Sequence, residues 1–144
     1  MKKKMNIVIV GLGNIGSYFY NYLKKNKNTL FSKTNTVPNI LYISAKSFTK
    51  KRNLKIPKKL WLKNCMSATN KKNVDIIIEL IGGAEGMAKK LVFEALRKKK
   101  HVITANKALV AKYGDQLAKI AEKNNVNFEF EAAVCGGIPI IRSI

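Results

Sequence analysis

Acidic side chains are scarce in this sequence. Of its 144 residues, 28 are lysine or arginine and 8 are aspartate or glutamate, so the formal net charge is +20. Such a balance is typical of nucleic-acid-binding proteins, but these also interleave aromatic side chains with their basic ones. Here the lysines are scattered through the expected helices, loops and turns, and arginines are few. We interpret the charge as a composition bias on solvated faces, and expect no specific nucleic acid partner, only weak polyanion binding at low salt.

Cysteine, histidine and long apolar runs are also in short supply. The two cysteines, Cys65 and Cys135, do not make a disulfide framework, and no Cys/His cluster has metal-ligand spacing. No apolar run approaches the length of a membrane span, and glycine interrupts the first one at Gly11. No repeat or low-complexity linker divides the chain. We expect a soluble, cytoplasmic chain without a membrane partner, whose 47% hydrophobic content fills the core of one domain.

The first strong pattern is a buried strand that runs into a glycine-rich turn. Residues 7–16 read I-V-I-V-G-L-G-N-I-G, an apolar strand followed by G-x-G-x-x-G and a helix-forming segment. In a dinucleotide-binding turn, Gly11 permits the tight bend, Gly13 lets the backbone approach a pyrophosphate, and Gly16 lets the helix pack on the strand. The N–H groups at the start of that helix supply an anion site. The pattern favours a cofactor turn, with a merely tight structural turn as the alternative.

Strands and helices alternate along the rest of the chain, which predicts an α/β fold with a Rossmann-like, doubly wound, mostly parallel sheet. Strands are expected at 7–10, 40–43, 74–81, 101–104 and 126–130, and helices from the glycine turn to residue 25, at 87–96 and at 114–123. The first helix should bury an apolar stripe of Ile15, Phe19, Tyr22 and Leu23. Residues 26–38 are polar and rich in turn formers. Residues 49–73 indicate a surface loop with a short helix anchored by Leu60, Trp61, Leu62 and Met66, in which Trp61 is a packing residue.

The end of the second strand bears on the choice of cofactor. An NAD site usually offers an acidic side chain there to the ribose 2′-hydroxyl, whereas a basic group suits a 2′-phosphate. This chain offers Ser44, Ala45 and Lys46, with further basic residues at 50–52 and no acid. We therefore predict a preference for NADP over NAD, with the general lysine excess as the alternative explanation.

Two further strands end at the same edge of the predicted sheet. Gly82 and Gly83 follow the strand at 74–81, where a glycine pair brings backbone close to the nicotinamide half of a dinucleotide. Glu79 lies inside that strand, so it either faces the cleft or accepts hydrogen bonds from a neighbouring loop. We therefore count both glycines among the cofactor-binding residues.

The strand at 101–104 ends in a cluster of Thr104, Asn106 and Lys107. A lysine there polarises a carbonyl or holds a carboxylate as a point charge, unless it is simply a solvated lysine. We count Thr104 and Lys107 as cofactor-binding candidates and Lys107 also as the catalytic candidate. His101, the sole histidine, begins this strand at the end away from the cleft, and we interpret it as structural.

Three separated segments together resemble homoserine dehydrogenase. They are V-G-L-G-N-I-G at 10–16, V-D-I-I-I-E-L-I-G-G at 74–83 with H-V-I-T-A-N-K-A-L at 101–109, and F-E-A-A-V-C-G-G-I-P-I-I at 130–141. The resemblance covers almost the whole chain and is weakest between residues 26 and 73. It implies hydride transfer between a nicotinamide cofactor and aspartate 4-semialdehyde, giving homoserine on the way to threonine, methionine and isoleucine.

The resemblance also implies roles for individual residues. The residues that match the family's dinucleotide-binding positions are Gly11, Gly13, Asn14, Ile15 and Gly16, with Lys46 at the 2′-phosphate and Lys107 contacting cofactor and substrate. In the family a monovalent cation, usually sodium, is bound at positions that match Glu131 and the backbone of Val134, Gly136 and Ile138. Carboxylate and carbonyl oxygens suit such an ion. We expect it to order the loop between domains rather than to take part in the chemistry.

In that family the substrate-binding and catalytic portion follows this segment and carries the main general-acid lysine. The resemblance thus implies an isolated cofactor domain, with residues 1–135 binding the dinucleotide and residues 136–144 beginning the connection to the catalytic domain. We expect cofactor binding with little or no turnover. The full-length enzyme is expected to be a homo-oligomer, a dimer.

Two other functions remain open from the residues alone. Cys135, just before Gly136, Gly137 and a helix start, suits the thiolate of a phosphorylating semialdehyde dehydrogenase, although no histidine lies near it in the sequence. The other alternative is a basic nucleic-acid-binding module, which the net charge alone supports.

Overall fold

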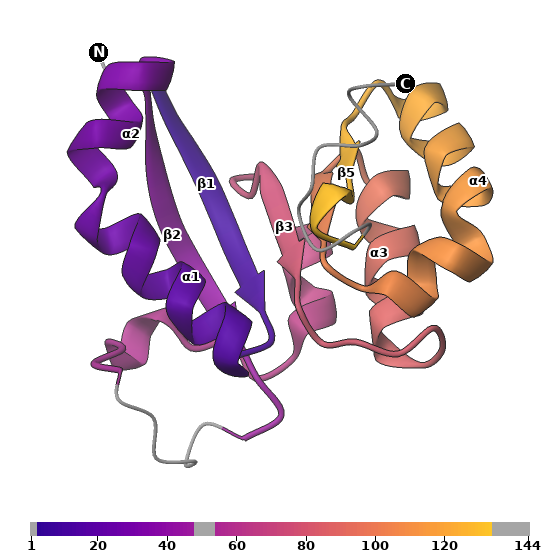
Figure 1. Ribbon diagram of the computed structural model, residues 1–144, viewed down its shortest axis with the longest axis horizontal. Helices are drawn as coiled ribbons and strands as arrows, with labels where there is room; N and C mark the ends of the chain where they lie inside the picture. Colours follow the sequence, from indigo (N-terminus) through magenta and orange to yellow (C-terminus); the bar gives the residue numbers. More distant parts are fainter. Residues whose placement is uncertain (1–2, 48–53, 134–144) are drawn as a thin grey trace.

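The computed structural model describes residues 3–47 and 54–133. Within them, five strands form one parallel sheet in the order β2-β1-β3-β4-β5 (Figure 1). The strands are β1 (Lys3–Val10), β2 (Thr36–Ser44), β3 (Ile76–Glu79), β4 (His101–Thr104) and β5 (Phe128–Glu129). The order reverses direction between β1 and β3, which is where doubly wound sheets bind ligands at the carboxyl ends of their strands.

Helices cover both faces of this sheet. The α-helices are α1 (Asn14–Lys25), α2 (Lys27–Thr34), α3 (Met87–Arg97) and α4 (Lys107–Asn124), and the short 3₁₀ helices are η1 (Lys58–Leu60), η2 (Cys65–Asn70) and η3 (Glu131–Ala133). In Figure 1, α1 and α2 lie on one side of the sheet and α3 and α4 on the other. The predicted doubly wound α/β architecture is therefore confirmed.

Successive residues of β1 supply two separate cores. Ile7 and Ile9 pack with α1 and with β2, whereas Val8 and Val10 pack with α3, α4 and η2. All four side chains are buried. Because neither face of β1 meets solvent at these positions, the strand is apolar without interruption, as buried parallel strands are.

The segment at 26–38 differs from the prediction of a turn-rich connection. It contains α2 and the first residues of β2, and Asn35 ends α2 in the left-handed conformation with φ of 51°. None of the residues of α2 is buried, so its sequence carries no apolar period by which a helix could be recognised. Pro38 is tolerated in β2 because this strand lies at the edge of the sheet.

The buried face of α1 also differs from the predicted stripe. Gly16, Tyr20 and Leu23 are buried, whereas Ile15 and Tyr22 are 64% and 42% exposed. The approach of Gly16 to the strand turns the helix so that the 16-20-23 row faces the sheet. The prediction holds for Leu23 and for the half-buried Phe19, and is wrong for the other two side chains.

Helix α4 begins earlier than the predicted residue 114, because Asn106 caps it by accepting a hydrogen bond from the backbone N–H of Leu109 at 3.1 Å. The structural roles predicted for Trp61 and His101 are confirmed. Trp61 forms a backbone β-bridge with Ile43 and packs on the α1 side of the core. The Nδ1 atom of His101 accepts a hydrogen bond from the Asn127 N–H at 3.0 Å. None of the helices in the described ranges is both long and apolar enough to cross a membrane.

Candidate functional site

Backbone packing fixes the turn between β1 and α1. Gly11 has a φ of +106°, and a Cβ atom on it would lie 2.4 Å from the Leu80 carbonyl oxygen. A Cβ atom on Gly16 would lie 2.0 Å from the Gly11 carbonyl oxygen. The Gly11 N–H donates to the Ser44 carbonyl at 2.8 Å. Both glycines are thus required by the close approach of neighbouring backbone, as the sequence predicts for the first and third glycines of such a turn.

Gly13 has the opposite surroundings. No heavy atom lies within 4 Å of a Cβ built on it, and its φ of −75° is open to any residue. It is the N-cap of α1, makes no side-chain capping hydrogen bond, and is followed by the exposed residues Asn14 and Ile15. The first turn of α1 contains no acidic residue. The positive end of the helix dipole is therefore accessible to an anion over Gly13.

The end of β2 lies beside this turn. Ser44 is buried and accepts the Gly11 N–H, and Lys46 is exposed two residues farther on. The basic residues at 50–52 lie outside the described residues. Of the basic residues predicted near a 2′-phosphate, the structure describes Lys46, just beyond the carboxyl end of β2. Its contact with a phosphate stays a prediction.

The carboxylate of Glu79 ties together the ends of β3 and β4. It is fully buried and accepts hydrogen bonds from the Ile81 N–H at 2.7 Å, the Gly82 N–H at 3.1 Å and the Thr104 hydroxyl at 2.5 Å. Of the two predicted possibilities for Glu79, the structure shows the second, acceptance of hydrogen bonds from a neighbouring loop. Because these three partners are all donors, the carboxylate suits the position.

The other residues predicted to bind the cofactor at the ends of β3 and β4 differ in their exposure. Gly82 and Gly83 are exposed with φ of +87° and +82°, and a Cβ atom on either would meet open space. Lys107 is exposed as the first residue of α4. Thr104 is fully buried and its hydroxyl is engaged by Glu79 and by the Asn106 N–H, so direct contact between this side chain and a cofactor stays a prediction.

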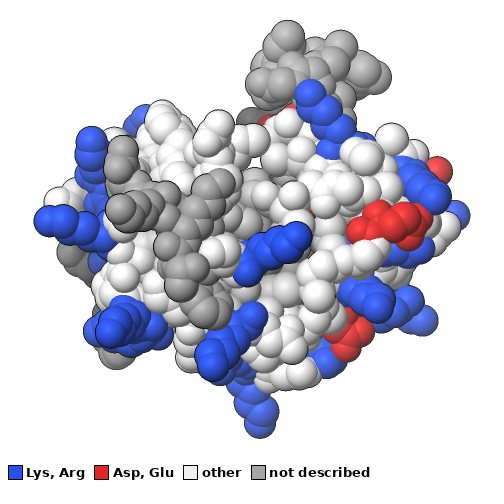
Figure 2. Space-filling view, turned by 90° about the horizontal axis from the view of Figure 1, so that it is seen from below, with Lys and Arg blue, Asp and Glu red and all other residues white. Residues whose placement is uncertain are grey.

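These loops share the carboxyl edge of the sheet, toward which the strands point in the lower part of Figure 1. Figure 2 looks onto that edge: lysine and arginine side chains are spread around it, and the acidic side chains gather toward one side. A positive edge with an open helix N-terminus at the reversal of strand order suits a ligand with several phosphate charges.

The family model described as homoserine dehydrogenase, NAD binding domain, matches residues 11–131. The chain belongs to the homoserine dehydrogenase family. It is 36% identical to the homoserine dehydrogenase of Bacillus subtilis over 99% of this chain and 33% of the relative, and 37% identical to that of Neisseria gonorrhoeae over 99% and 32%. The chain thus spans about a third of the length of these curated relatives.

Solved homoserine dehydrogenases share the fold. The enzyme from Thiobacillus denitrificans superposes with a TM-score of 0.89 at 34% identity, covering 98% of this chain and 32% of that one. The Staphylococcus aureus enzyme at pH 7.5 gives a TM-score of 0.85 at 36% identity, over 92% and 34%. A hyperthermophilic archaeal homoserine dehydrogenase in complex with NADPH, 22% identical, has the same fold with a TM-score of 0.78 over 96% and 47%.

The predicted cation site is described only at its first residue. Glu131 begins η3 and is partly buried, whereas Val134, Gly136 and Ile138 lie outside the described residues. In the part of the chain that the structure describes, no three His, Cys, Asp or Glu side chains gather as metal ligands would. The sodium site therefore stays a prediction.

Neither alternative function gains support. Cys135 lies outside the described residues. Cys65 is buried, and this burial raises the pKa of its thiol, which disfavours a thiolate nucleophile. The family match covers residues 11–131 and names a cofactor-binding domain, not a nucleic-acid-binding one.

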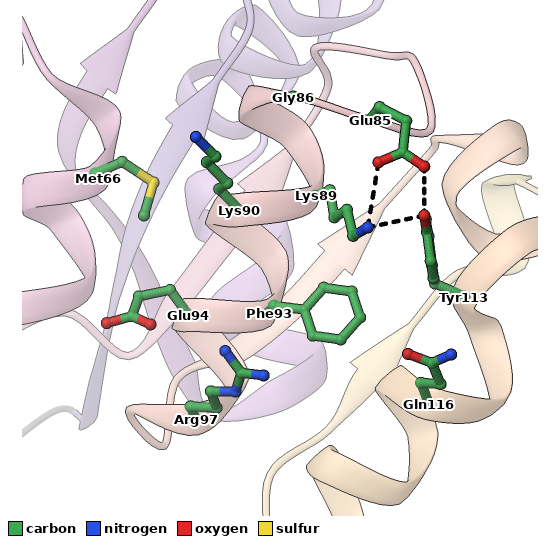
Figure 3. Close-up of a pocket in the computed structure, with 10 residues that line it drawn as sticks. All are labelled: Met66, Glu85, Gly86, Lys89, Lys90, Phe93, Glu94, Arg97, Tyr113 and Gln116. Atoms are coloured by element: carbon green, nitrogen blue, oxygen red, sulfur yellow. Dashed lines mark hydrogen bonds and ion pairs between the residues drawn. The ribbon is translucent and has the colours of Figure 1, made fainter.

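A hollow lies over the outer surface of α3, lined also by residues of η2, α4 and the loop that precedes α3. Its volume is about 540 Å³, and none of the predicted cofactor residues lines it. At its rim the Glu85 carboxylate accepts hydrogen bonds from Lys89 at 3.2 Å and from the Tyr113 hydroxyl (Figure 3). It also accepts one from Lys112 at 2.7 Å. These contacts join the start of α3 to the middle of α4, and they lower the pKa of Glu85 to about 2, the Lys112 hydrogen bond contributing most.

The two glycines of the turn should respond differently to a methyl group. Gly16→Ala should destabilise the fold by about 2 kcal/mol, because the new Cβ overlaps backbone that cannot move without opening the turn. Gly13→Ala should leave the free energy of unfolding nearly unchanged, since its Cβ meets open space. Urea unfolding followed by circular dichroism measures both. Equal destabilisation by the two variants would contradict this description of the turn.

Glu85 should make stability depend on acid pH. Its folded pKa of about 2 lies below the ordinary value of 4.5, so its contribution is complete above about pH 4.5 and is lost as pH falls toward 2. We expect Glu85→Gln to be less stable than the parent at pH 7 and equal to it near pH 2. Glu122→Gln, on the exposed surface of α4, is the control, and urea unfolding at several pH values is the measurement. A stability gap that persists unchanged at pH 2 would exclude this role for Glu85.

Proposed function

We propose that this chain is the cofactor-binding portion of an enzyme that interconverts aspartate 4-semialdehyde and homoserine by hydride transfer to or from NAD(P). The observation that carries the proposal is the β1–α1 turn. Gly11 and Gly16 are locked by backbone contacts while Gly13 leaves the N-terminus of α1 open. This combination is what a pyrophosphate requires: a rigid turn, close approach to the backbone and unoccupied N–H donors.

The order of the strands gives the dinucleotide its direction along the edge. With the pyrophosphate over Gly13, Asn14 and Ile15, the adenosine half extends toward β2 and Lys46, and the nicotinamide half toward the ends of β3 and β4. There it meets the backbone of Gly82 and Gly83 and the ammonium group of Lys107. The cofactor supplies the hydride. Lys107 holds a positive charge beside the nicotinamide end, where it attracts a carboxylate or polarises a carbonyl oxygen of the substrate.

The charge at the end of β2 favours NADP within this proposal. Lys46 is exposed there, and Ser44 offers no carboxylate to a ribose 2′-hydroxyl. A phosphate on that hydroxyl gains a cationic partner, whereas an unmodified ribose does not. An archaeal homoserine dehydrogenase of the same fold has been solved in complex with NADPH.

The remaining features of the family complete the proposal. Residues 1–135 form the cofactor domain, and residues 136–144 begin the connection to a catalytic domain. A sodium ion bound by Glu131 and by the backbone of Val134, Gly136 and Ile138 orders that connection. The complete enzyme acts in the cytoplasm as a homodimer, with threonine and methionine among the products of its pathway.

Cofactor titration tests the binding proposal. We expect NADPH to bind about tenfold more tightly than NADH, the effect of one charge-assisted contact at the 2′-phosphate. Lys46→Glu should abolish this preference, and Lys119→Glu, which makes the same charge change on the exposed surface of α4, should not. Quenching of protein fluorescence measures the dissociation constants. Tighter binding of NADH would refute the NADP preference, and failure to bind either cofactor would refute the proposed function.

Turnover should be separable from binding. We expect the purified 144-residue chain to bind NADPH yet, with NADP⁺ as the hydride acceptor, to oxidise homoserine at a negligible rate. It spans about a third of the length of its relatives, and the family resemblance implies that the substrate-binding portion lies in the remainder. Absorbance at the nicotinamide band measures the rate, with a full-length homoserine dehydrogenase as the positive control. Rapid homoserine oxidation by this chain alone would show that the active site is complete within it.

A further inference from the structure

A buried chain of hydrogen bonds joins the two loops that face the nicotinamide end of the proposed site. It begins at Glu79, whose carboxylate holds the N–H groups of Ile81 and Gly82 through one oxygen. The other oxygen accepts the Thr104 hydroxyl at 2.5 Å. Both side chains have no exposed surface, so water does not compete for these contacts.

The hydrogen-bond network continues from Thr104 to Asn106. The Thr104 hydroxyl oxygen accepts the Asn106 N–H at 3.0 Å while its proton goes to Glu79. The Asn106 side chain donates to the Gly83 carbonyl at 2.7 Å and accepts the Leu109 N–H at 3.1 Å. The path therefore leaves the loop after β3 at Gly82 and returns to it at Gly83, passing on the way through the residue that caps α4.

This closed path of hydrogen bonds fixes the positions of the Gly82–Gly83 backbone and of Lys107. Gly82 and Gly83 both have positive φ and no side chain with which to pack. Their backbone is therefore positioned by the groups that hydrogen-bond to it. Lys107 directly follows Asn106 and begins α4. Breaking the bond between Glu79 and Thr104 would uncouple the glycine loop from the start of α4, although each keeps its other hydrogen bonds. It would leave the β1–α1 turn and Lys46 in place.

We propose that Glu79, acting with Thr104, is a positioning residue that sets the affinity for the nicotinamide half of the cofactor. Neither side chain touches the cofactor. Their hydrogen bond holds the Gly82–Gly83 backbone and Lys107 in register across the ends of β3 and β4. The inference rests on the proposed function, because it presumes that a dinucleotide lies along this edge.

Isosteric substitutions at Glu79 and Thr104 test whether their hydrogen bond sets the affinity for the nicotinamide half. Glu79→Gln keeps one oxygen for the loop N–H groups but presents an amide N–H₂ to Thr104, whose proton then lacks an acceptor. Thr104→Val removes the hydroxyl at constant shape, and Thr104→Ser keeps it. Each variant is titrated with NADPH and with adenosine 2′,5′-bisphosphate, which carries the phosphates of the adenosine half and lacks the nicotinamide. Thermal unfolding checks that each variant is folded at the titration temperature.

We expect Glu79→Gln and Thr104→Val to weaken NADPH binding about tenfold, the effect of losing one charge-assisted hydrogen bond. Both should bind the bisphosphate as the parent does. The double variant should be no worse than either single one, because the two substitutions remove the same contact. Thr104→Ser should retain parental affinity for NADPH, which loss of packing alone would not predict.

Three results would overturn the inference while leaving the proposed function in place. Unchanged NADPH affinity in both Glu79→Gln and Thr104→Val would show that the bond does not position the loop. Equal weakening of NADPH and the bisphosphate would indicate general loosening of the fold. A parent chain that binds the bisphosphate but gains nothing from the nicotinamide half would also refute it. A parent that binds neither ligand would instead refute the proposed function and, with it, this inference.

Discussion

The contact between the backbones of Gly11, Gly16 and Leu80 is the constraint on which the rest of the structure depends. It brings the start of α1 against the end of β1 and, in the same few ångströms, against the chain leaving β3. The Leu80 N–H donates to the Val10 carbonyl at 2.7 Å, which extends the pairing of β1 and β3 beyond their last ladder residues. Side chains larger than hydrogen at the two glycines would separate all three segments. Close main-chain contacts therefore hold the segments together at the point where the strand order reverses.

Around that contact, the carboxyl edge of the sheet combines buried residues that hold the loops with exposed residues that a ligand can reach. Ser44, Glu79 and Thr104 are buried and use their polar atoms to hold neighbouring loops. Gly13, Lys46 and Lys107 are exposed. Preorganised support beneath accessible groups is what allows a binding site to keep its geometry before the ligand arrives.

The sequence was most informative where structure follows from local spacing. The glycines at 11, 13 and 16 predicted both the turn and its place at the carboxyl end of a strand. Close backbone contacts require Gly11 and Gly16, whereas Gly13 stands in open space. Helix α2 escaped prediction because it buries none of its residues and so has no apolar period. The inward face of α1 was assigned by hydrophobicity, although the close packing of Gly16 decides it.

The network at Glu79 could be anticipated only in part. A carboxylate inside an apolar strand signals that partners must exist, but the sequence does not say that Thr104, 25 residues away, supplies one of them. Asn106 carried a local signal, since asparagine before a helix-forming segment is a common cap. Its second contact, with Gly83, depends on β3 and β4 being neighbours. Long-range pairing of this kind follows from the topology of the sheet and not from any one stretch of chain.

The position of Trp61 gives the molecule an intrinsic optical reporter. It is the sole tryptophan, and it bridges to Ile43 near the end of β2, immediately before Ser44 and the exposed Lys46. Its emission therefore originates from a single site, beside the carboxyl end of β2. Energy transfer from this indole to a reduced nicotinamide would measure the distance between the end of β2 and the nicotinamide of a bound dinucleotide, without any label being attached to the protein.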